Sequence, residues 1–154
     1  LRTFKEQQIR READNQLAAR IEQDGLISFI DFWENISLFD SQKSLSCDLQ
    51  EQIRCERLER SPVGLANSLR GIGTGQQPSY WLKLNELENP VYLVTGEYDT
   101  KYTKIASEML TYLKDGAHLQ VLSVGHAIHV ENPVEFATII KEQVINGKIR
   151  GGRL

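Results

Sequence analysis

The feature that most constrains this sequence is the pattern after Pro90, where two compact apolar runs alternate with two amphipathic segments. The first run is rich in β-branched residues and ends at Gly96, and the second ends at Gly125. In chain order the predicted elements are a strand over 91–95, a helix over 101–113, a strand over 119–124 and a helix over 133–144. This order predicts a βαβα unit with parallel strands. Two parallel strands are not stable as a sheet alone, so we expect further strands from a missing upstream segment or from another chain.

The first half of the chain shows helical spacing almost throughout. Thr3 and Glu6 fit a capping box, Gly25 is expected to break the first helix, and Ser61-Pro62 fits a helix start. The predicted elements are helices over 3–21, 26–36, 48–60, 63–72 and 79–87, with a serine-rich loop over 37–46 and a glycine-rich loop over 71–78. The sequence thus predicts a helical first half followed by an α/β second half.

Charge and composition argue against several classes of function. The chain has 18 basic and 21 acidic residues and a formal charge of −3, without the basic stripe that is typical of nucleic-acid binding. Its longest apolar runs fall far short of the roughly 18 residues that span a bilayer. Cys47 and Cys55 form no CxxC motif, which favours free thiols in a reducing compartment and a cytoplasmic location. The first residue is Leu1 rather than Met, so we expect a piece of a longer protein.

Polar side chains follow both predicted strands at their carboxyl ends, where functional groups gather in open parallel sheets. Asp99 follows the first strand and His126 follows the second. A carboxylate that accepts the Nδ1 proton of an imidazole fixes its tautomer and stabilises the imidazolium that forms when Nε2 takes a proton. The alternative, that Asp99 only caps the following helix and that His126 is a buried polar residue, stays open from spacing alone.

No hydroxyl that would complete such a pair is evident in the sequence. A serine elbow needs G-x-S-x-G, and the nearest match, residues 121–125, lacks the first glycine and leads into His126 instead of a helix. His126, His129 and Glu131 do not have a zinc-protease spacing, and the two histidines would point to opposite faces of an extended segment, so no metal site is expected. Residues 71–75 resemble a phosphate loop but follow a helix, and a flexible connector is favoured.

Several arginines on predicted helices have two open interpretations. They either solvate the surface or bind substrate carboxylates through bidentate contacts. These arginines are Arg10, Arg54, Arg57 and Arg70.

Two stretches of the second half, Val91–Asp99 and Gly125–Pro133, resemble the acid and histidine motifs of the α/β-hydrolase superfamily in order and in spacing. The helical half resembles the cap of one family within it, the 2-succinyl-6-hydroxy-2,4-cyclohexadiene-1-carboxylate synthases of menaquinone biosynthesis. The segments that carry this second resemblance are Phe32–Phe39, Glu56–Leu58, Ser68–Trp81, and Leu1–Thr3 with Arg10, Arg11 and Asp14. Together the resemblance covers residues 1 to about 145.

The resemblance implies the fold and the reaction. The fold would be the C-terminal portion of an α/β-hydrolase with a helical cap. The family's enzymes are carbon–oxygen lyases that take a proton from 2-succinyl-5-enolpyruvyl-6-hydroxy-3-cyclohexene-1-carboxylate and eliminate pyruvate, with no metal or organic cofactor. A triad serine, made basic by histidine and aspartate, accepts that proton.

The resemblance also implies roles for particular residues. Asp99 would be the triad acid and His126 the triad base. Arg10 and Arg57 would bind carboxylates of a polycarboxylate substrate. The aromatic side chains that would line the cavity are those of Phe32 and Trp33. No role is implied for Arg70.

One large departure accompanies these expectations. We expect a helical cap region over 1–88, the C-terminal βαβα part of the core over 89–146 and a polar tail over 147–154. The family's amino-terminal half, with core strands, oxyanion hole and serine elbow, is missing, so we expect this chain to need that half as its partner and to be inactive alone. The alternatives are another α/β-hydrolase, such as an esterase or a carbon–carbon bond hydrolase, and a non-catalytic remnant.

Overall fold

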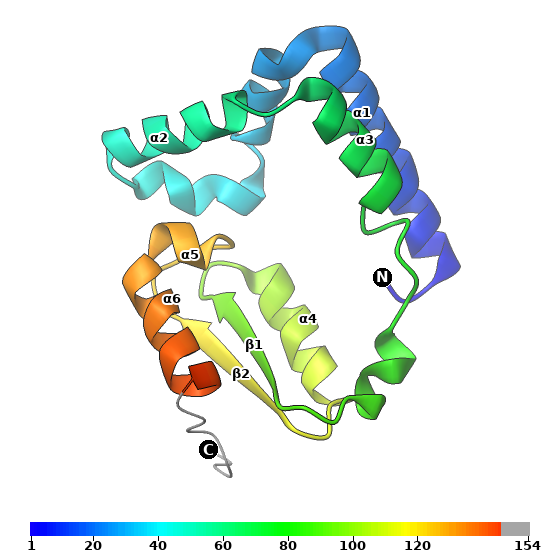
Figure 1. Cartoon of the computed structure of the whole chain (residues 1–154), viewed down its shortest axis with the longest axis vertical. Coiled ribbons are helices and arrows are strands. Elements are labelled where there is room, and N and C mark those ends of the chain that lie inside the picture. The colour runs from blue at the N-terminus through cyan, green and yellow to red at the C-terminus, as the bar shows by residue number, and fades with distance from the viewer. Residues whose placement is uncertain (146–154) are drawn as a thin grey trace. The chain divides into compact units, whose positions relative to one another are not determined.

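The computed structural model describes residues 1–145, and the chain divides into two compact units (Figure 1). The helical unit comprises Leu1–Ser37 and Leu45–Leu84, and the sheet unit comprises Leu38–Ser44 together with the chain from Asn85 onward. The expected division into a cap over 1–88 and a core part over 89–146 stays a prediction. The tail expected over 147–154 lies outside the described residues.

The helical unit is built on helices that begin at clear sequence signals. They are α1 (Phe4–Trp33), α2 (Cys47–Leu58) and α3 (Pro62–Ile72), and the 3₁₀ helix η2 (Trp81–Glu86) follows them. Before each α-helix a hydroxyl accepts a backbone N–H of the first turn, from Thr3, Ser46 and Ser61 respectively. Such caps satisfy one of the N–H groups that a helix start leaves without a partner.

Gly25 interrupts α1 as the sequence predicts. Its φ of 81° and ψ of 167° are non-helical and belong to a region that essentially only glycine occupies. The helix therefore kinks at Gly25 and continues to Trp33, where a turn replaces the last residues of the helix expected over 26–36.

The core of the helical unit forms where α1 packs against α3. Ile21, Phe29 and Ile30 are buried at its centre. The partly buried side chains that pack around them are Leu17, Leu26, Trp33, Leu58, Leu65 and Leu69. Helices α2 and α3 thus both attach to the apolar face of α1.

The sheet unit confirms the βαβα order. Its elements are β1 (Val91–Gly96), α4 (Thr100–Leu110), β2 (Gly116–Val121), α5 (Ile128–Glu131), α6 (Pro133–Ile140) and the π-helical turn η3 (Lys141–Ile145). The two strands are parallel, with Val91 paired to Gly116 and Gly96 to Val121. Within residues 1–145 these two strands make up the whole sheet.

Several predicted boundaries were wrong, each for a local reason. The second strand lies at 116–121 rather than 119–124, because Leu122 and Ser123 form a turn in which Ser123 has a φ of 60°. The serine-rich segment expected as a loop contains the 3₁₀ helix η1 (Ser37–Ser44). Helix α4 ends at Leu110 instead of 113.

Helices α4 and α6 cover opposite faces of the sheet (Figure 1). Side chains alternate between faces along a strand. Thr95 faces α4, where its hydroxyl meets that of Thr103, whereas Val94 and Val121 pack with Phe136 of α6. Both faces of this small sheet are therefore covered.

Among residues 1–145, no helix has both the length and the apolar character needed to cross a membrane.

Candidate functional site

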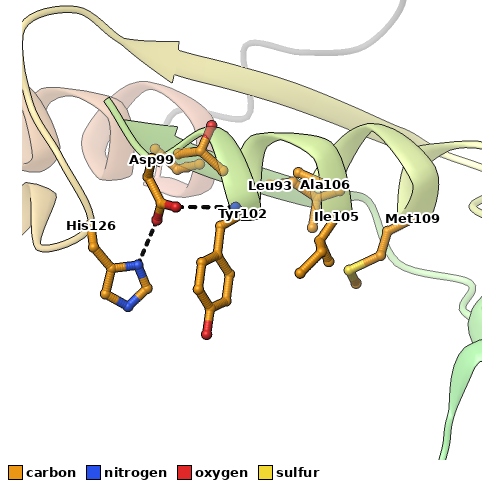
Figure 2. A pocket seen from close by; sticks show the side chains of 9 residues that line it. Leu93, Asp99, Tyr102, Ile105, Ala106, Met109 and His126 are labelled. Carbon is orange, nitrogen blue, oxygen red and sulfur yellow. Dashed lines mark hydrogen bonds and ion pairs between the residues drawn. The ribbon is translucent and has the colours of Figure 1, made fainter. Parts of the chain in front are cut away.

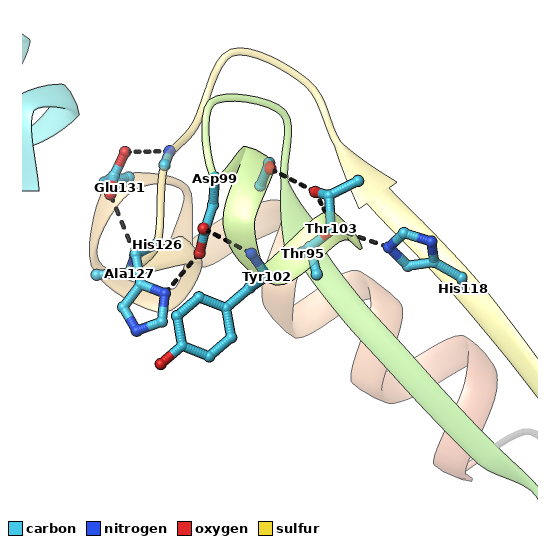
Figure 3. Close-up of polar contacts among 10 residues, drawn as sticks. Thr95, Asp99, Tyr102, Thr103, His118, His126, Ala127 and Glu131 are labelled. Atoms are coloured by element: carbon cyan, nitrogen blue, oxygen red, sulfur yellow. Dashed lines mark hydrogen bonds and ion pairs between the residues drawn. The ribbon is translucent and has the colours of Figure 1, made fainter. Parts of the chain in front are cut away.

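The carboxyl ends of β1 and β2 bring Asp99 and His126 into contact. Nδ1 of His126 lies 2.6 Å from Oδ2 of Asp99 (Figure 3). Because a carboxylate can only accept hydrogen bonds, the hydrogen of this bond is on Nδ1, and Nε2 is the acceptor of the neutral ring. Asp99 is 6% exposed, so water does not compete for the contact. This is the geometry expected from the sequence, and the catalytic role of the pair stays a prediction.

Asp99 has a second function as the cap of α4. Its Oδ1 accepts the backbone N–H of Tyr102 at 3.1 Å, while Oδ2 holds the imidazole. Asp99 therefore caps α4 and also contacts the imidazole of His126. His126 is not a buried polar residue, since its side chain is 33% exposed.

The two loops that carry the pair are joined by hydrogen bonds in both directions. We call residues 97–99 the acid loop and residues 122–127 the histidine loop. Tyr98 of the acid loop donates its N–H to the carbonyl of Val124 at 2.9 Å. In the other direction, the N–H of Ser123 donates to Oε2 of Glu97 at 2.7 Å. Asp99 and His126 therefore lie on loops that these two hydrogen bonds hold together.

A pocket of about 180 Å³ lies beside the imidazole (Figure 2). The ring of Tyr102 is tilted against that of His126, with centroids 4.6 Å apart, and Phe39 of η1 approaches at 6.5 Å. Ile105 and Met109 of α4 extend the apolar wall. The exposed part of His126 therefore borders a largely apolar space next to the edge of the sheet.

Within residues 1–145, Nε2 of His126 has no hydrogen-bond partner. Ser123, the centre of the incomplete elbow match, lies in the turn after β2, and no helix begins until Ile128. It therefore does not occupy a strand-to-helix elbow. The arrangement is an oriented base whose reactive nitrogen is open to a further group.

The three side chains considered as metal ligands are engaged in other contacts. The Glu131 carboxylate accepts two backbone N–H bonds, Nδ1 of His126 binds Asp99, and His129 packs against the ring of Phe136. The expectation of an extended segment here was wrong, since Ile128–Glu131 is the short helix α5. Among the residues that the structure describes, no three His, Cys, Asp or Glu side chains gather around a common point.

Arg10 and Arg57 lie in the helical unit, and each contacts a carboxylate of that unit. Nε of Arg10 donates to Oδ1 of the buried Asp14 at 2.8 Å. Arg57 donates to Oε1 of Glu34 at 3.3 Å, and its side chain is 20% exposed. Both guanidinium groups are thus oriented by neighbouring acids, and their part in substrate binding stays a prediction.

Phe32 and Trp33 have different surroundings although they are adjacent. Trp33 stacks on Phe29 with centroids 5.6 Å apart and joins the core of the helical unit. Phe32 is 36% exposed, and the guanidinium of Arg20 lies 4.1 Å from its ring centre. Phe32 thus has free surface for a ligand, whereas Trp33 mainly packs the unit.

The other two arginines form ion pairs. Arg54 bridges Asp31 and Glu34, and these hydrogen bonds raise the pKa of its guanidinium. Arg70 donates to both oxygens of Glu22, which raises the pKa of Arg70 and lowers that of Glu22. Arg70 therefore joins α3 to α1.

Comparisons with known proteins agree with this fold. No protein-family model matches the chain. The sequence is 43% identical over 142 residues to the putative 2-succinyl-6-hydroxy-2,4-cyclohexadiene-1-carboxylate synthase of Bacillus subtilis, covering 92% of this chain and 52% of that protein. A solved structure of MenH from S. aureus superposes with a TM-score of 0.92 at 35% identity, covering 97% of this chain and 56% of that one. An esterase from Thermogutta terrifontis shares the fold alone, with a TM-score of 0.72 at 20% identity, covering 88% of this chain and 50% of that one.

The parallel strands with helices on both faces, together with the similarity to the MenH structure, show that the chain has the fold of a C-terminal portion of an α/β-hydrolase. In sequence it is similar to 2-succinyl-6-hydroxy-2,4-cyclohexadiene-1-carboxylate synthases. The chain spans about half the length of the relatives it matches.

Sequence reasoning missed several residues that shape the site. Tyr102 was not distinguished from an ordinary helix residue, and Phe39 and Glu97 were noted only as parts of motifs. Tyr102 lies three residues after the helix-capping Asp99, and this spacing could have indicated that it is close to Asp99, since residues of the first turn lie close to the cap. For Phe39 no sequence signal exists, because its partner is far away in the chain.

Proposed function

We propose that this chain contributes the acid, the base and the cap of a carbon–oxygen lyase. The proposed reaction eliminates pyruvate from 2-succinyl-5-enolpyruvyl-6-hydroxy-3-cyclohexene-1-carboxylate and gives 2-succinyl-6-hydroxy-2,4-cyclohexadiene-1-carboxylate in menaquinone biosynthesis. The observation that carries the proposal is the 2.6 Å contact between Asp99 and Nδ1 of His126, with Nε2 directed to no other group of the described chain. The 43% identity to the Bacillus subtilis protein supports this particular reaction over others of the superfamily.

In the proposed mechanism His126 acts as a base through a hydroxyl. Nε2 takes the proton of a serine supplied from outside this chain, and the resulting alkoxide takes a proton from the substrate ring. The electrons of that C–H bond form a ring double bond as the C–O bond to the enolpyruvyl group breaks, and the leaving enolate takes the proton held by Nε2 of His126 and becomes pyruvate. Asp99 stabilises the imidazolium while it holds the proton.

We further propose that the helical unit recognises the carboxylates of the substrate. Guanidinium groups bind carboxylates through paired, charge-assisted hydrogen bonds, and Arg10 and Arg57 are the cations assigned to this task. Asp14 and Glu34 support the assignment, because an acid that orients a guanidinium reduces the side-chain freedom lost on binding. Phe32 and Trp33 are the proposed aromatic lining of the cavity.

The proposal includes a partner and a location. The partner is an amino-terminal half that supplies the serine and further strands. The two-stranded sheet within residues 1–145 supports this, because further strands could pair with it. The exposed free thiols of Cys47 and Cys55 support a reducing compartment, which we take to be the cytoplasm.

Complementation tests this proposal. The chain is co-expressed with the part of the Bacillus subtilis relative that it does not match, and pyruvate release from the enolpyruvyl substrate is measured. We expect release from the complemented enzyme and none from the chain alone. The matched control is His126→Ala, which should lower turnover by several orders of magnitude.

Two outcomes would contradict the proposal. Pyruvate release by the isolated chain would show that no external serine is needed. Hydrolysis of simple esters by the complemented enzyme, without elimination of pyruvate, would favour an esterase instead.

A further inference from the structure

The carboxylate of Glu131 binds the backbone on both sides of His126 (Figure 3). Its Oε2 accepts the N–H of Gly125 at 2.6 Å, and its Oε1 accepts the N–H of Ala127 at 3.2 Å. His126, the catalytic base we propose, therefore lies between two residues whose backbone N–H groups are both held by the Glu131 side chain. The proposed mechanism does not use Glu131.

The local fold explains how one side chain reaches both amides. Glu131 is the last residue of α5, and its own N–H donates to the carbonyl of Ala127 at 2.9 Å, so the helix turns back over its start. Ala127, the residue before the helix, has no side chain that can cap it. Glu131 is partly buried, and its carboxylate supplies the cap at the start of α5 that the Ala127 side chain cannot provide.

The histidine loop is also confined from the opposite side. A Cβ atom added to Gly125 would lie 2.8 Å from Cβ of Ser41 and nearer still to its Oγ, and 3.3 Å from Oε1 of Glu131. Position 125 therefore lies between η1 and the Glu131 carboxylate with no room for a side chain. A small displacement of this backbone would move the imidazole directly, because His126 is the next residue.

We propose that Glu131 is a positioning residue for His126. By holding the N–H groups of Gly125 and Ala127, it fixes the backbone from which the imidazole projects toward Asp99. A carboxylate suits this task because each of its two oxygens accepts one N–H, whereas an amide has only one accepting oxygen. The structural part of this inference stands by itself, and its kinetic part rests on the proposed function.

The variant that tests the proposal is Glu131→Gln in the full 154-residue chain. Glutamine keeps the size of the side chain but leaves one of the two amides without an acceptor. Glu135→Gln is the matched control, since Glu135 is an exposed acid in the first turn of α6 whose carboxylate has no hydrogen bond within the described residues. Nuclear magnetic resonance follows the amide hydrogen exchange of Gly125 and Ala127 and the Nδ1–H resonance of His126.

The expected result separates positioning from simple helix capping. In Glu131→Gln, exchange at one or both amides should become about 10- to 100-fold faster, and the Nδ1–H resonance should shift or broaden as the bond to Asp99 weakens. An unchanged Nδ1–H resonance in a folded Glu131→Gln chain would overturn the proposal, because Glu131 would then cap α5 without affecting the imidazole. Should that variant not fold, Glu131→Asp, which keeps the charge on a shorter side chain, decides the question by the same resonance.

A kinetic measurement on the complemented enzyme extends the test. Glu131→Gln should lower kcat about 10-fold or more and leave KM within about twofold, since substrate recognition is assigned elsewhere. A raised KM with unchanged kcat would contradict the positioning role. If the complemented parent enzyme releases no pyruvate, the proposed function fails, and the resonance experiment still decides whether Glu131 orients His126.

Discussion

A Cβ atom added at Gly96 would clash with the carbonyl oxygen of Gly125, and the carbonyl oxygen of Val124 lies 2.5 Å from that Cβ position. The end of β1 and the histidine loop are thus in contact through backbone atoms alone. Because this approach sets how far Asp99 lies from His126, a side chain at position 96 should affect both stability and the site.

Gly96→Ala should destabilise the sheet unit by about 1–3 kcal/mol, the usual cost of forcing an added group into a closely packed region. Urea unfolding of the parent and the variant measures the difference. Gly71→Ala is the matched control, because nothing lies within 4 Å of its Cβ position in α3, and it should stabilise the chain by about 0.5–1 kcal/mol. Equal stabilities of Gly96→Ala and the parent would show that the two loops separate without cost.

A chain of hydrogen bonds connects β2 to α4 through Thr95 (Figure 3). Nε2 of His118 lies 2.8 Å from the Thr95 hydroxyl, which lies 3.0 Å from the hydroxyl of Thr103. The Thr103 hydroxyl donates to the carbonyl of Gly96. Since a carbonyl only accepts, every group is satisfied when the donors run from His118 Nε2–H through Thr95 and Thr103 to Gly96.

Thr95→Val keeps the shape of the side chain but interrupts this chain of donors. The buried hydroxyl is replaced by a methyl group, which leaves His118 and Thr103 without their partner and should cost about 1–3 kcal/mol. Thermal unfolding checks this against Thr138→Val, an exposed position in α6 that should change stability by less than about 0.5 kcal/mol. A parent-like Tm for Thr95→Val would mean that water replaces the lost partner.

The ion pair between Glu22 and Arg70 makes the stability of the helical unit depend on pH. The Arg70 hydrogen bonds lower the pKa of Glu22 below the usual pKa of a glutamate. The ion pair therefore contributes fully to stability at pH values above the usual pKa, and this contribution is lost as the pH falls through the lowered pKa. Glu22→Gln should therefore reduce the Tm at neutral pH and match the parent in strong acid. Tm values measured across this pH range test the sign, and a difference that grows toward acid would contradict it.

The sequence predicted those features that depend on local chemistry. Gly25 breaks α1 because few other residues adopt its backbone conformation, and Ser61 caps α3 because a hydroxyl is needed there. The proximity of Asp99 and His126 followed from the geometry of parallel strands, since both residues lie just beyond strand ends. These signals are short-range or topological, and a single sequence contains them.

The features that the sequence did not reveal depend on tertiary contacts. Leu122 continues the apolar pattern of β2 but is 68% exposed in a turn. Hydrophobicity alone therefore predicted a strand that begins and ends three residues later than β2 does. Glu131 was considered only as a metal ligand, because its contacts depend on the turn of α5. Glu34, which orients Arg57 and Arg54, lies just after α1, and spacing within α2 cannot show that contact.

Asp99→Asn separates the two functions of that side chain. Asparagine is a good helix cap, so α4 and the circular-dichroism spectrum should persist. Its amide cannot serve as the anionic acceptor that stabilises the imidazolium, so turnover of the complemented enzyme should fall by about 10³- to 10⁴-fold. A variant that is folded and nearly fully active would refute the role of Asp99 as the triad acid.

Arg57 and Arg54 provide a matched pair for testing substrate recognition. Both donate to Glu34 from α2, but only Arg57 is assigned to a substrate carboxylate. Arg57→Ala should raise the KM of the complemented enzyme about 10- to 100-fold, because a hydrogen bond between charged groups contributes about 1.5–3 kcal/mol to binding. Arg54→Ala should leave KM within about twofold, since it removes only the ion pairs with Asp31 and Glu34 inside the helical unit. Equal effects of the two substitutions would mean that Glu34 and its partners only stabilise the helical unit, and the carboxylate site would then have to be sought at Arg10.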